Sequence, residues 1–132
     1  MSLCVVSAGT VLTLLAGSFS LSWTHSVEKT TWIEYWRAEN GQLMLTAASV
    51  EGSGAGIDPP PDAVWAGGRW TYRPALAPLS RLHLAASGTT VGGWQLCANG
   101  ACHVLGAVAE DDVTIWTTDA VCSLDPLVEP QR

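Results

Sequence analysis

The sequence predicts an all-β fold: a single antiparallel β-sandwich or partly open barrel of about 8–11 short strands. No stretch of more than about ten residues keeps a helical period, whereas apolar runs of strand length recur between Gly, Pro and Asn residues. Two dipeptides, Asn40-Gly41 and Asn99-Gly100, favour two-residue hairpin turns, because such turns need positive φ at both central positions. We expect one β domain over residues 1–123 and a flexible tail over 124–132.

The first two predicted strands are the apolar runs Leu3–Ser7 and Thr10–Leu15. Their Val and Thr residues favour strand, and we expect both strands to be buried. Residues 1–24 carry no charged side chain, so a signal peptide or a membrane-spanning helix is the alternative. No Lys or Arg precedes the apolar part, and Ser, Thr and Gly interrupt it, which disfavours both. An export signal upstream of this sequence stays open.

The next two strands form the centre of the predicted sheet. Residues Phe19–His25 alternate between apolar and small polar side chains, which is typical of a half-buried strand. Residues Thr30–Ala38 carry bulky side chains on both faces, so this strand is expected to be central or to lie against a partner. A turn at Ser26–Lys29 would place Trp23 opposite Trp32.

The Asn40-Gly41 turn predicts a return strand over Leu43–Val50. A regular hairpin then pairs Glu34 with Ala47. Residues 52–61 contain three Gly and three Pro and are expected to form an irregular loop. Later strands, each bounded by Gly or Pro, are predicted around Trp70 and Tyr72, Leu82–Ala86, Trp94–Cys97, Cys102–Gly106 and Val113–Thr118.

The charge pattern excludes some partners and leaves others open. The net charge is -6 and the six Lys and Arg residues are scattered, so we expect neither nucleic acid nor an anionic membrane surface as a partner. Charged residues are only 14% of the chain, against the usual ~25%. This low fraction indicates either a face covered by a protein, membrane or ligand, or a Ser- and Thr-rich surface on which nothing docks.

Four cysteines point to disulfides. The second Asn-Gly turn makes Cys97 and Cys102 a non-hydrogen-bonded pair, the position where opposite side chains come closest. Cys4 and Cys122 would then pair by default. Reduced thiols and a zinc site are the alternatives, although Cys-x4-Cys lacks a second pair of ligands. Disulfides would indicate an oxidising compartment.

One predicted sheet face combines tryptophans with polar groups: Trp23, His25, Trp32, Glu34 and Trp36. Burial among tryptophans would raise the pKa of Glu34, which suits proton chemistry. His25 and Glu34 would lie ~13 Å apart at ~3.3 Å per residue, so they form no catalytic dyad. The structural alternative is a core of tryptophans beside a turn ordered by hydrogen bonds to its backbone.

A buried Glu34 needs a partner, which Arg69, Arg73 or a ligand would supply. We expect no catalytic residue, because Gly-x-Ser-x-Gly spacing is missing around Ser53. We also expect no cofactor and no metal, and an enzyme is less favoured than a binding protein. If a ligand binds, its candidate site comprises His25, Glu28, Glu34, Ser53, Asp58 and Tyr72.

Several motifs resemble the pattern of a small bacterial family of unknown function, whose genes commonly sit beside those of TAXI-type TRAP transporters. The resemblance spans most of the chain, and its most specific parts are a His-Ser-Val-Glu run and a Gly-Ser-Gly-Ala-Gly loop. The matching residues are Ser22-Trp23-Thr24-His25-Ser26-Val27-Glu28, Trp32, Glu34, Trp36, Gly52-Ser53-Gly54-Ala55-Gly56-Ile57-Asp58-Pro59-Pro60, Trp94-Gln95-Leu96-Cys97, Cys102 and Cys4.

The resemblance implies a periplasmic protein with an N-terminal hydrophobic leader. Because this sequence begins almost at the matching Cys4, such a leader would lie upstream. The resemblance also supports disulfides and supplies no catalytic residues. It favours a non-catalytic accessory protein that docks the binding protein or membrane subunit of a TRAP transporter through a tryptophan-rich face, with any membrane contact indirect or through the leader. The alternative is a small-ligand-binding β-domain, or less favourably a hydrolase, with its site at the Gly-rich loop.

Overall fold

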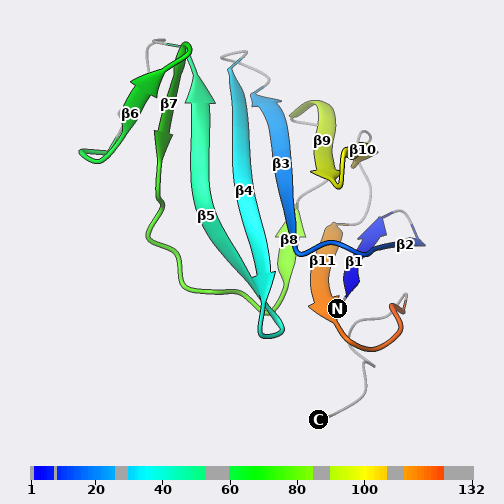
Figure 1. Cartoon of the computed structure of the whole chain (residues 1–132). Coiled ribbons are helices and arrows are strands. Elements are labelled where there is room, and N and C mark those ends of the chain that lie inside the picture. Colours follow the sequence, from blue (N-terminus) through cyan, green and yellow to red (C-terminus); the bar gives the residue numbers. More distant parts are fainter. Residues whose placement is uncertain are drawn as a thin grey trace.

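The computed structural model is a two-sheet sandwich (Figure 1). It describes residues 2–7, 9–25, 30–52, 60–84, 90–106 and 112–123. Both sheets are antiparallel, and they pack together without closing into a barrel, so the predicted all-β sandwich is confirmed. The described strands are β1 (Ser2–Ser7), β2 (Thr10–Leu14), β3 (Ser18–His25), β4 (Thr31–Glu39), β5 (Gln42–Glu51), β6 (Val64–Ala66), β7 (Arg69–Tyr72), β8 (Leu82–Leu84), β9 (Thr90–Ala98), β10 (Ala101–Leu105) and β11 (Val113–Thr118).

The large sheet has seven strands in the order β10-β9-β3-β4-β5-β7-β6, and the small sheet has four in the order β2-β1-β11-β8. β4 lies in the middle of the large sheet, as the bulk on both of its faces predicts. β1 and β11, from opposite ends of the chain, pair with each other at the centre of the small sheet. The two faces of the large sheet are called inner, toward the small sheet, and outer, away from it.

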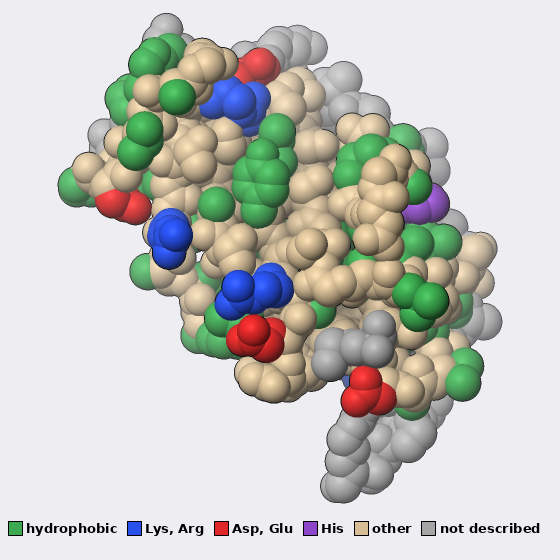
Figure 2. Space-filling model, in the orientation of Figure 1, with side chains coloured by type: hydrophobic (Ala, Val, Ile, Leu, Met, Phe, Trp, Pro, Cys, Tyr) green, Lys and Arg blue, Asp and Glu red, His purple; other side chains and the backbone are tan. Residues whose placement is uncertain are grey.

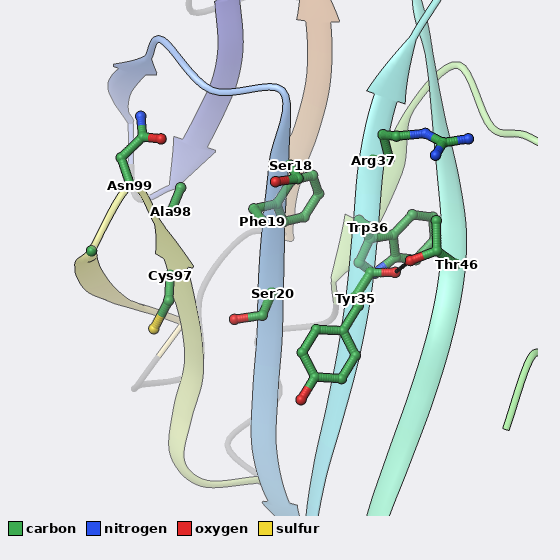
Figure 3. Close-up of a pocket in the computed structure, with 11 residues that line it drawn as sticks. Ser18, Phe19, Ser20, Tyr35, Trp36, Arg37, Thr46, Cys97, Ala98 and Asn99 are labelled. Atoms are coloured by element: carbon green, nitrogen blue, oxygen red, sulfur yellow. Dashed lines mark hydrogen bonds between the residues drawn. The ribbon is translucent and has the colours of Figure 1, made fainter. Parts of the chain in front are cut away.

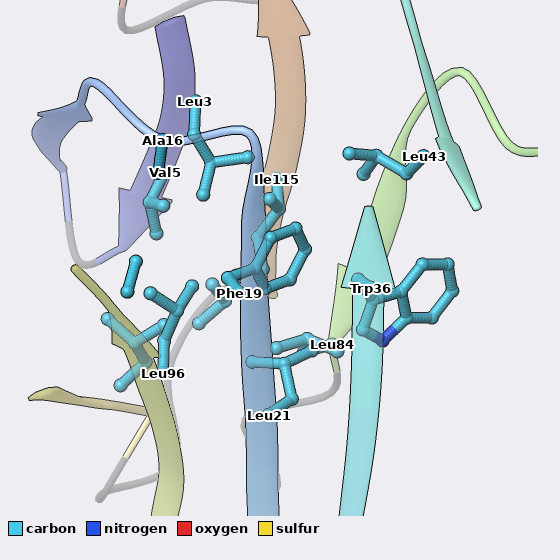
Figure 4. Packing of buried hydrophobic residues seen from close by; sticks show 13 residues of the cluster. Leu3, Val5, Ala16, Phe19, Leu21, Trp36, Leu43, Leu84, Leu96 and Ile115 are labelled. Carbon is cyan, nitrogen blue, oxygen red and sulfur yellow. The ribbon is translucent and has the colours of Figure 1, made fainter. Parts of the chain in front are cut away.

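The core fills the space between the two sheets (Figure 4). Leu3, Val5 and Ile115 of the small sheet meet Phe19 and Leu21 of the large sheet, and all five are buried. The described core takes its large-sheet residues from β3, β4, β5, β9 and β10. In Figure 1, β6 and β7 stand away from the small sheet. Part of the inner face therefore extends beyond the core, and this part carries the candidate site.

Both Asn-Gly turns are confirmed. Asn40 and Asn99 have φ values of 54° and 52°, and the glycine that follows each also has positive φ. These are the left-handed conformations that a type I' hairpin requires, and Asn and Gly adopt them at the lowest cost.

The predicted pairing of Glu34 with Ala47 is wrong by one residue. Glu34 pairs with Ala48, because a bulge shifts the register and Thr46 is the extra residue. The Thr46 hydroxyl donates a hydrogen bond to the Tyr35 carbonyl at 2.9 Å and so fixes the bulge. A bulge bends its strand and re-aims the side chains beside it.

Residues near the N-terminus form strands, so the helical alternative is wrong. Within the described residues, no helix is long and apolar enough to cross a membrane. The expectation that both strands are buried holds for the centre of β1 but not for β2, since β2 is an edge strand of the small sheet. Leu15, just after β2, is 77% exposed.

Both predicted disulfides are present. Cys97 and Cys102 are directly opposite residues of the β9–β10 hairpin, and their sulfurs are bonded. Cys4 of β1 is bonded to Cys122, which follows β11. All four cysteines are thus oxidised, and the reduced-thiol and zinc alternatives are wrong. Two disulfides are compatible with an extracytoplasmic location.

Candidate functional site

Tryptophans line one end of the inner face of the large sheet. Trp23 and Trp32 are opposite residues of β3 and β4, and their rings stack with centroids 6.2 Å apart. Trp65 and Trp70 are opposite residues of β6 and β7, with ring centroids 5.1 Å apart. Val50 of β5 pairs with Trp32 on one side and Trp70 on the other, so these residues form one continuous row. We call Trp23, Trp32, Trp70 and Trp65 the tryptophan row.

Glu34 lies in the neighbouring row on the same face. It is two residues from Trp32 on β4, and successive side chains of a strand alternate between faces. Its cross-strand partners are Leu21 on β3 and Ala48 on β5, and Ala48 in turn pairs with Tyr72 on β7. Ala48 therefore places only a methyl group between the carboxyl of Glu34 and the ring of Tyr72.

The carboxyl of Glu34 is partly buried and has one hydrogen-bond donor among the described residues. The indole Nε1 of Trp36 donates to Glu34 Oε1 at 3.1 Å. Burial raises the pKa of Glu34, and this hydrogen bond opposes the rise only in part. Burial, together with the negative charge of Glu34, also raises the pKa of Tyr72. Tyr72 therefore senses the negative charge of Glu34 across Ala48.

The cationic partner that the sequence suggested is not found at Glu34. The Arg69 guanidinium donates to the Ser49 hydroxyl at 2.6 Å and to the Thr31 carbonyl at 2.9 Å, on the outer face. Arg69 pairs with Glu51 across the strands, so its side chain lies on the opposite face from Glu34. Arg73 has no ion pair with Glu34 among the described contacts. Within the described residues, Glu34 has no Lys, Arg or His partner.

The structure brings together part of the site predicted from the sequence. Glu34 and Tyr72 share one face with Trp23 and Trp32, and Trp70 joins them; we call these five residues the Glu34 site. All five side chains are partly exposed. The role of Trp70 was missed, although its spacing of two residues from Tyr72 was a sufficient signal.

The remaining predicted residues divide into two groups. Trp36 is 3% exposed and stacks on Phe19, so it belongs to the core and touches the site only through its indole nitrogen. His25 ends β3, and its side chain is not among the described ones. Three other predicted site residues lie outside the described part of the chain: Glu28, Ser53 and Asp58.

A second hollow, on the outer face, was not predicted (Figure 3). It is a groove of about 530 Å³ between β3, β4, β5 and the β9–β10 hairpin. Tyr35, which is 42% exposed, lines it together with Ser18 and Ser20. Figure 3 shows the hydrogen bond from Thr46 to Tyr35 beside it, so the bulge helps to shape the groove.

The described lining of the groove has hydrogen-bonding groups but no acid–base pair. Arg37 is the one charged side chain among its described lining residues, and Glu39 lies 3.6 Å from it. On this outer face, positive and negative side chains lie near each other in small groups rather than in one patch (Figure 2). The sequence signal for the groove is the alternating serines of β3, one of which lies opposite Tyr35. The bulge beside Tyr35 has no such signal in the sequence.

Comparison with known proteins places the chain in a family. Residues 19–105 match the family described as Domain of unknown function (DUF1850), and since this range is well over half of the 132 residues, the chain belongs to that family. The matched range contains the described strands of the large sheet except for Ser18, the first residue of β3, whereas β1, β2 and β11 of the small sheet lie outside it. Neither the curated proteins nor the solved structures contain a match.

Proposed function

We propose that this protein is a non-catalytic accessory protein of a TAXI-type TRAP transporter. It docks the binding protein or the membrane subunit through the end of the large sheet where the tryptophan row reaches edge strand β6. The resemblance of its His-Ser-Val-Glu and Gly-Ser-Gly-Ala-Gly motifs suggests the partner system, and the geometry of β6 suggests the surface. Two disulfides favour the periplasmic side, where disulfides form and persist.

The observation that carries the proposal is that no described strand covers the edge formed by β6. This strand is last in the order of the described large sheet and contains no charged residue. Val64 is 63% exposed and Trp65 is 46% exposed. Edge strands are usually shielded by charges, Pro or bulges, because they can pair with a strand of another chain. An exposed tryptophan on such an edge fits a partner that adds a strand and buries the ring as an anchor.

A matched pair of variants tests this surface. Val64 on β6 and Val104 on β10 are both 63% exposed, and they lie on the two opposite edge strands of the large sheet. In pull-downs with a purified TAXI-type binding protein, and separately with the permease, Val64→Lys should weaken the complex at least tenfold, because a charge would enter the contact. A tenfold change corresponds to about 1.4 kcal/mol.

The control, Val104→Lys, should leave the complex unchanged. Val64 lies on the outer face of β6 and Trp65 on the inner face, so equal binding by the wild type, Val64→Lys and Trp65→Ala would rule out β6 as the contact. No complex between the wild-type protein and either component at micromolar concentration would refute the accessory function itself.

A second candidate function is that of a small-ligand-binding β-domain, with Glu34 and the aromatic residues around it as the part of its site that the structure describes. The observation that favours it is the partly buried carboxyl of Glu34 without a cation among the described residues. A ligand present at about 100 times its Kd would stabilise the fold by about 2.7 kcal/mol, which a thermal-shift screen detects. Tyr72→Ala should abolish that stabilisation. Tyr35→Ala, which changes a tyrosine on the outer face of the same sheet, should preserve it.

A further inference from the structure

We propose that the Glu34 site binds an organic cation of the methylated-ammonium class. This inference rests on the ligand-binding function and names the chemistry of its ligand. Neither the family description nor the transporter proposal assigns such a ligand.

The first argument is the charge of Glu34. A carboxylate that loses water on burial must gain a positive partner or take up a proton. Here the described surroundings provide one neutral donor, the Trp36 indole, at 3.1 Å. Arg69 is committed to Ser49 and Thr31 on the other face of the sheet, and Arg73 has no ion pair with Glu34 among the described contacts. A bound cation would therefore form an ion pair with Glu34 that no described side chain forms.

The second argument is the chemistry of the surrounding surface. Trp32 lies two residues before Glu34 on the same face, and Trp23 stacks against Trp32. On the far side of Ala48 and Val50, Tyr72 and Trp70 provide two more aromatic rings. Aromatic ring faces are negative and attract cations, tryptophan most strongly, and cages of aromatic rings recognise quaternary ammonium groups.

The third argument is the small number of oxygen and nitrogen atoms that the site offers to a cation. This number disfavours metal ions and primary ammonium groups. A zinc ion needs about four ligand atoms and a calcium ion about six to eight, while this site supplies one carboxylate among aromatic rings. No group of His, Cys, Asp and Glu able to hold a metal exists among the described residues. A primary ammonium carries three N–H donors that each need an acceptor. A methylated ammonium needs fewer acceptors and presents methyl groups to the rings.

The experiment is a titration of the full chain with choline chloride at constant ionic strength, followed by tryptophan fluorescence. We expect a saturable change, because three tryptophans line the site. The neutral analogue 3,3-dimethylbutan-1-ol has the shape of choline without its charge and should bind at least tenfold more weakly. This comparison uses the wild-type protein, so it does not depend on the folding of a variant.

A matched pair of variants locates the charge. Glu34→Gln keeps the shape and the acceptor for Trp36 but should weaken choline binding at least tenfold. Glu39→Gln makes the same chemical change at an exposed position of the same strand and should have no effect. Circular dichroism verifies that both variants are folded.

The outcomes separate the two proposals. If choline and its neutral analogue bind equally and Glu34→Gln has no effect, the cation class is wrong while ligand binding stands. No saturable signal with choline also overturns the cation proposal. The thermal-shift screen with Tyr72→Ala then decides whether the site binds any ligand.

Discussion

At the scale of single residues, the structure corrects what the sequence implied about Glu34. The pattern of alternation correctly placed Glu34 on one face with Trp23 and Trp32. It could not identify the partner of the carboxyl, because the face that Arg69 takes depends on the register of β7 against β5. Partial burial without a cation is a costly arrangement, and such arrangements are more typical of sites than of cores.

The raised pKa of Glu34 predicts how stability depends on pH. The pKa of Glu34 in the folded protein lies above the ordinary value of 4.5. At pH values between these two pKa values, the folded state therefore holds a proton that the unfolded state has lost. Stability should therefore fall relative to Glu34→Gln as pH rises from about 4.5 through the raised pKa, and then level off. Tyr72 is the titratable group that faces Glu34 across Ala48.

Urea unfolding of both proteins between about pH 3.5 and pH 8 measures this difference. The difference in the free energy of unfolding between the wild type and Glu34→Gln should be constant below the ordinary pKa of Glu34. A difference that stays constant across the whole range, or that favours the wild type as pH rises, would contradict the prediction.

At the scale of elements, the two Asn-Gly hairpins were predictable because their local turn chemistry decides them. They are not equivalent in the structure. The Asn99 side-chain nitrogen donates to the Leu15 carbonyl at 2.6 Å, which ties the β9–β10 hairpin to the connection between β2 and β3. For Asn40, no side-chain hydrogen bond occurs within the described part of the chain.

Replacing each asparagine by glycine separates turn geometry from this tether. Glycine accepts positive φ, so both variants keep the turn and share the same cost in chain entropy. Asn99→Gly should lower the free energy of unfolding by about 1 kcal/mol more than Asn40→Gly, the typical net value of one hydrogen bond. Urea unfolding measures both, and equal losses would show that the tether adds nothing.

The bulge at Thr46 marks the limit of prediction at this scale. Asn40-Gly41 fixes the register near the turn, but no local signal in Thr46 announces an extra residue. The bulge depends on how β5 fits β4 and β7 together, which is tertiary information. The outer groove follows from it and was missed for the same reason.

At the scale of the whole molecule, the all-β class and the Cys97–Cys102 pairing were predictable from the turns, whereas Cys4 and Cys122 could be paired only as the two cysteines left over. The division of the strands between two sheets was not predictable, because β8 joins the small sheet although β7 and β9 join the large one. The Cys4–Cys122 disulfide encloses most of the chain, with a sequence separation of 118, whereas Cys97 and Cys102 are separated by 5.

The two disulfides should differ in their effect on stability. On the chain-entropy model, loss of the long-range bond in Cys4→Ala/Cys122→Ala costs about 5 kcal/mol, and loss of the short one in Cys97→Ala/Cys102→Ala costs about 2 kcal/mol. Chemical unfolding of the two double variants measures both values. Equal losses would mean that loop closure does not dominate either effect.

Strand order also determines when this protein can finish folding. The strands of the large sheet occupy residues 18–105, but β11, which lies between β1 and β8, is synthesised after all of them. Until β11 leaves the ribosome, the nascent chain bears Phe19 and Leu21 on a sheet face without its full cover. Such transient apolar surface is where aggregation begins and where chaperones bind. The order of synthesis therefore predicts a need for protection before the chain is complete, a need that is hidden once the sandwich has closed.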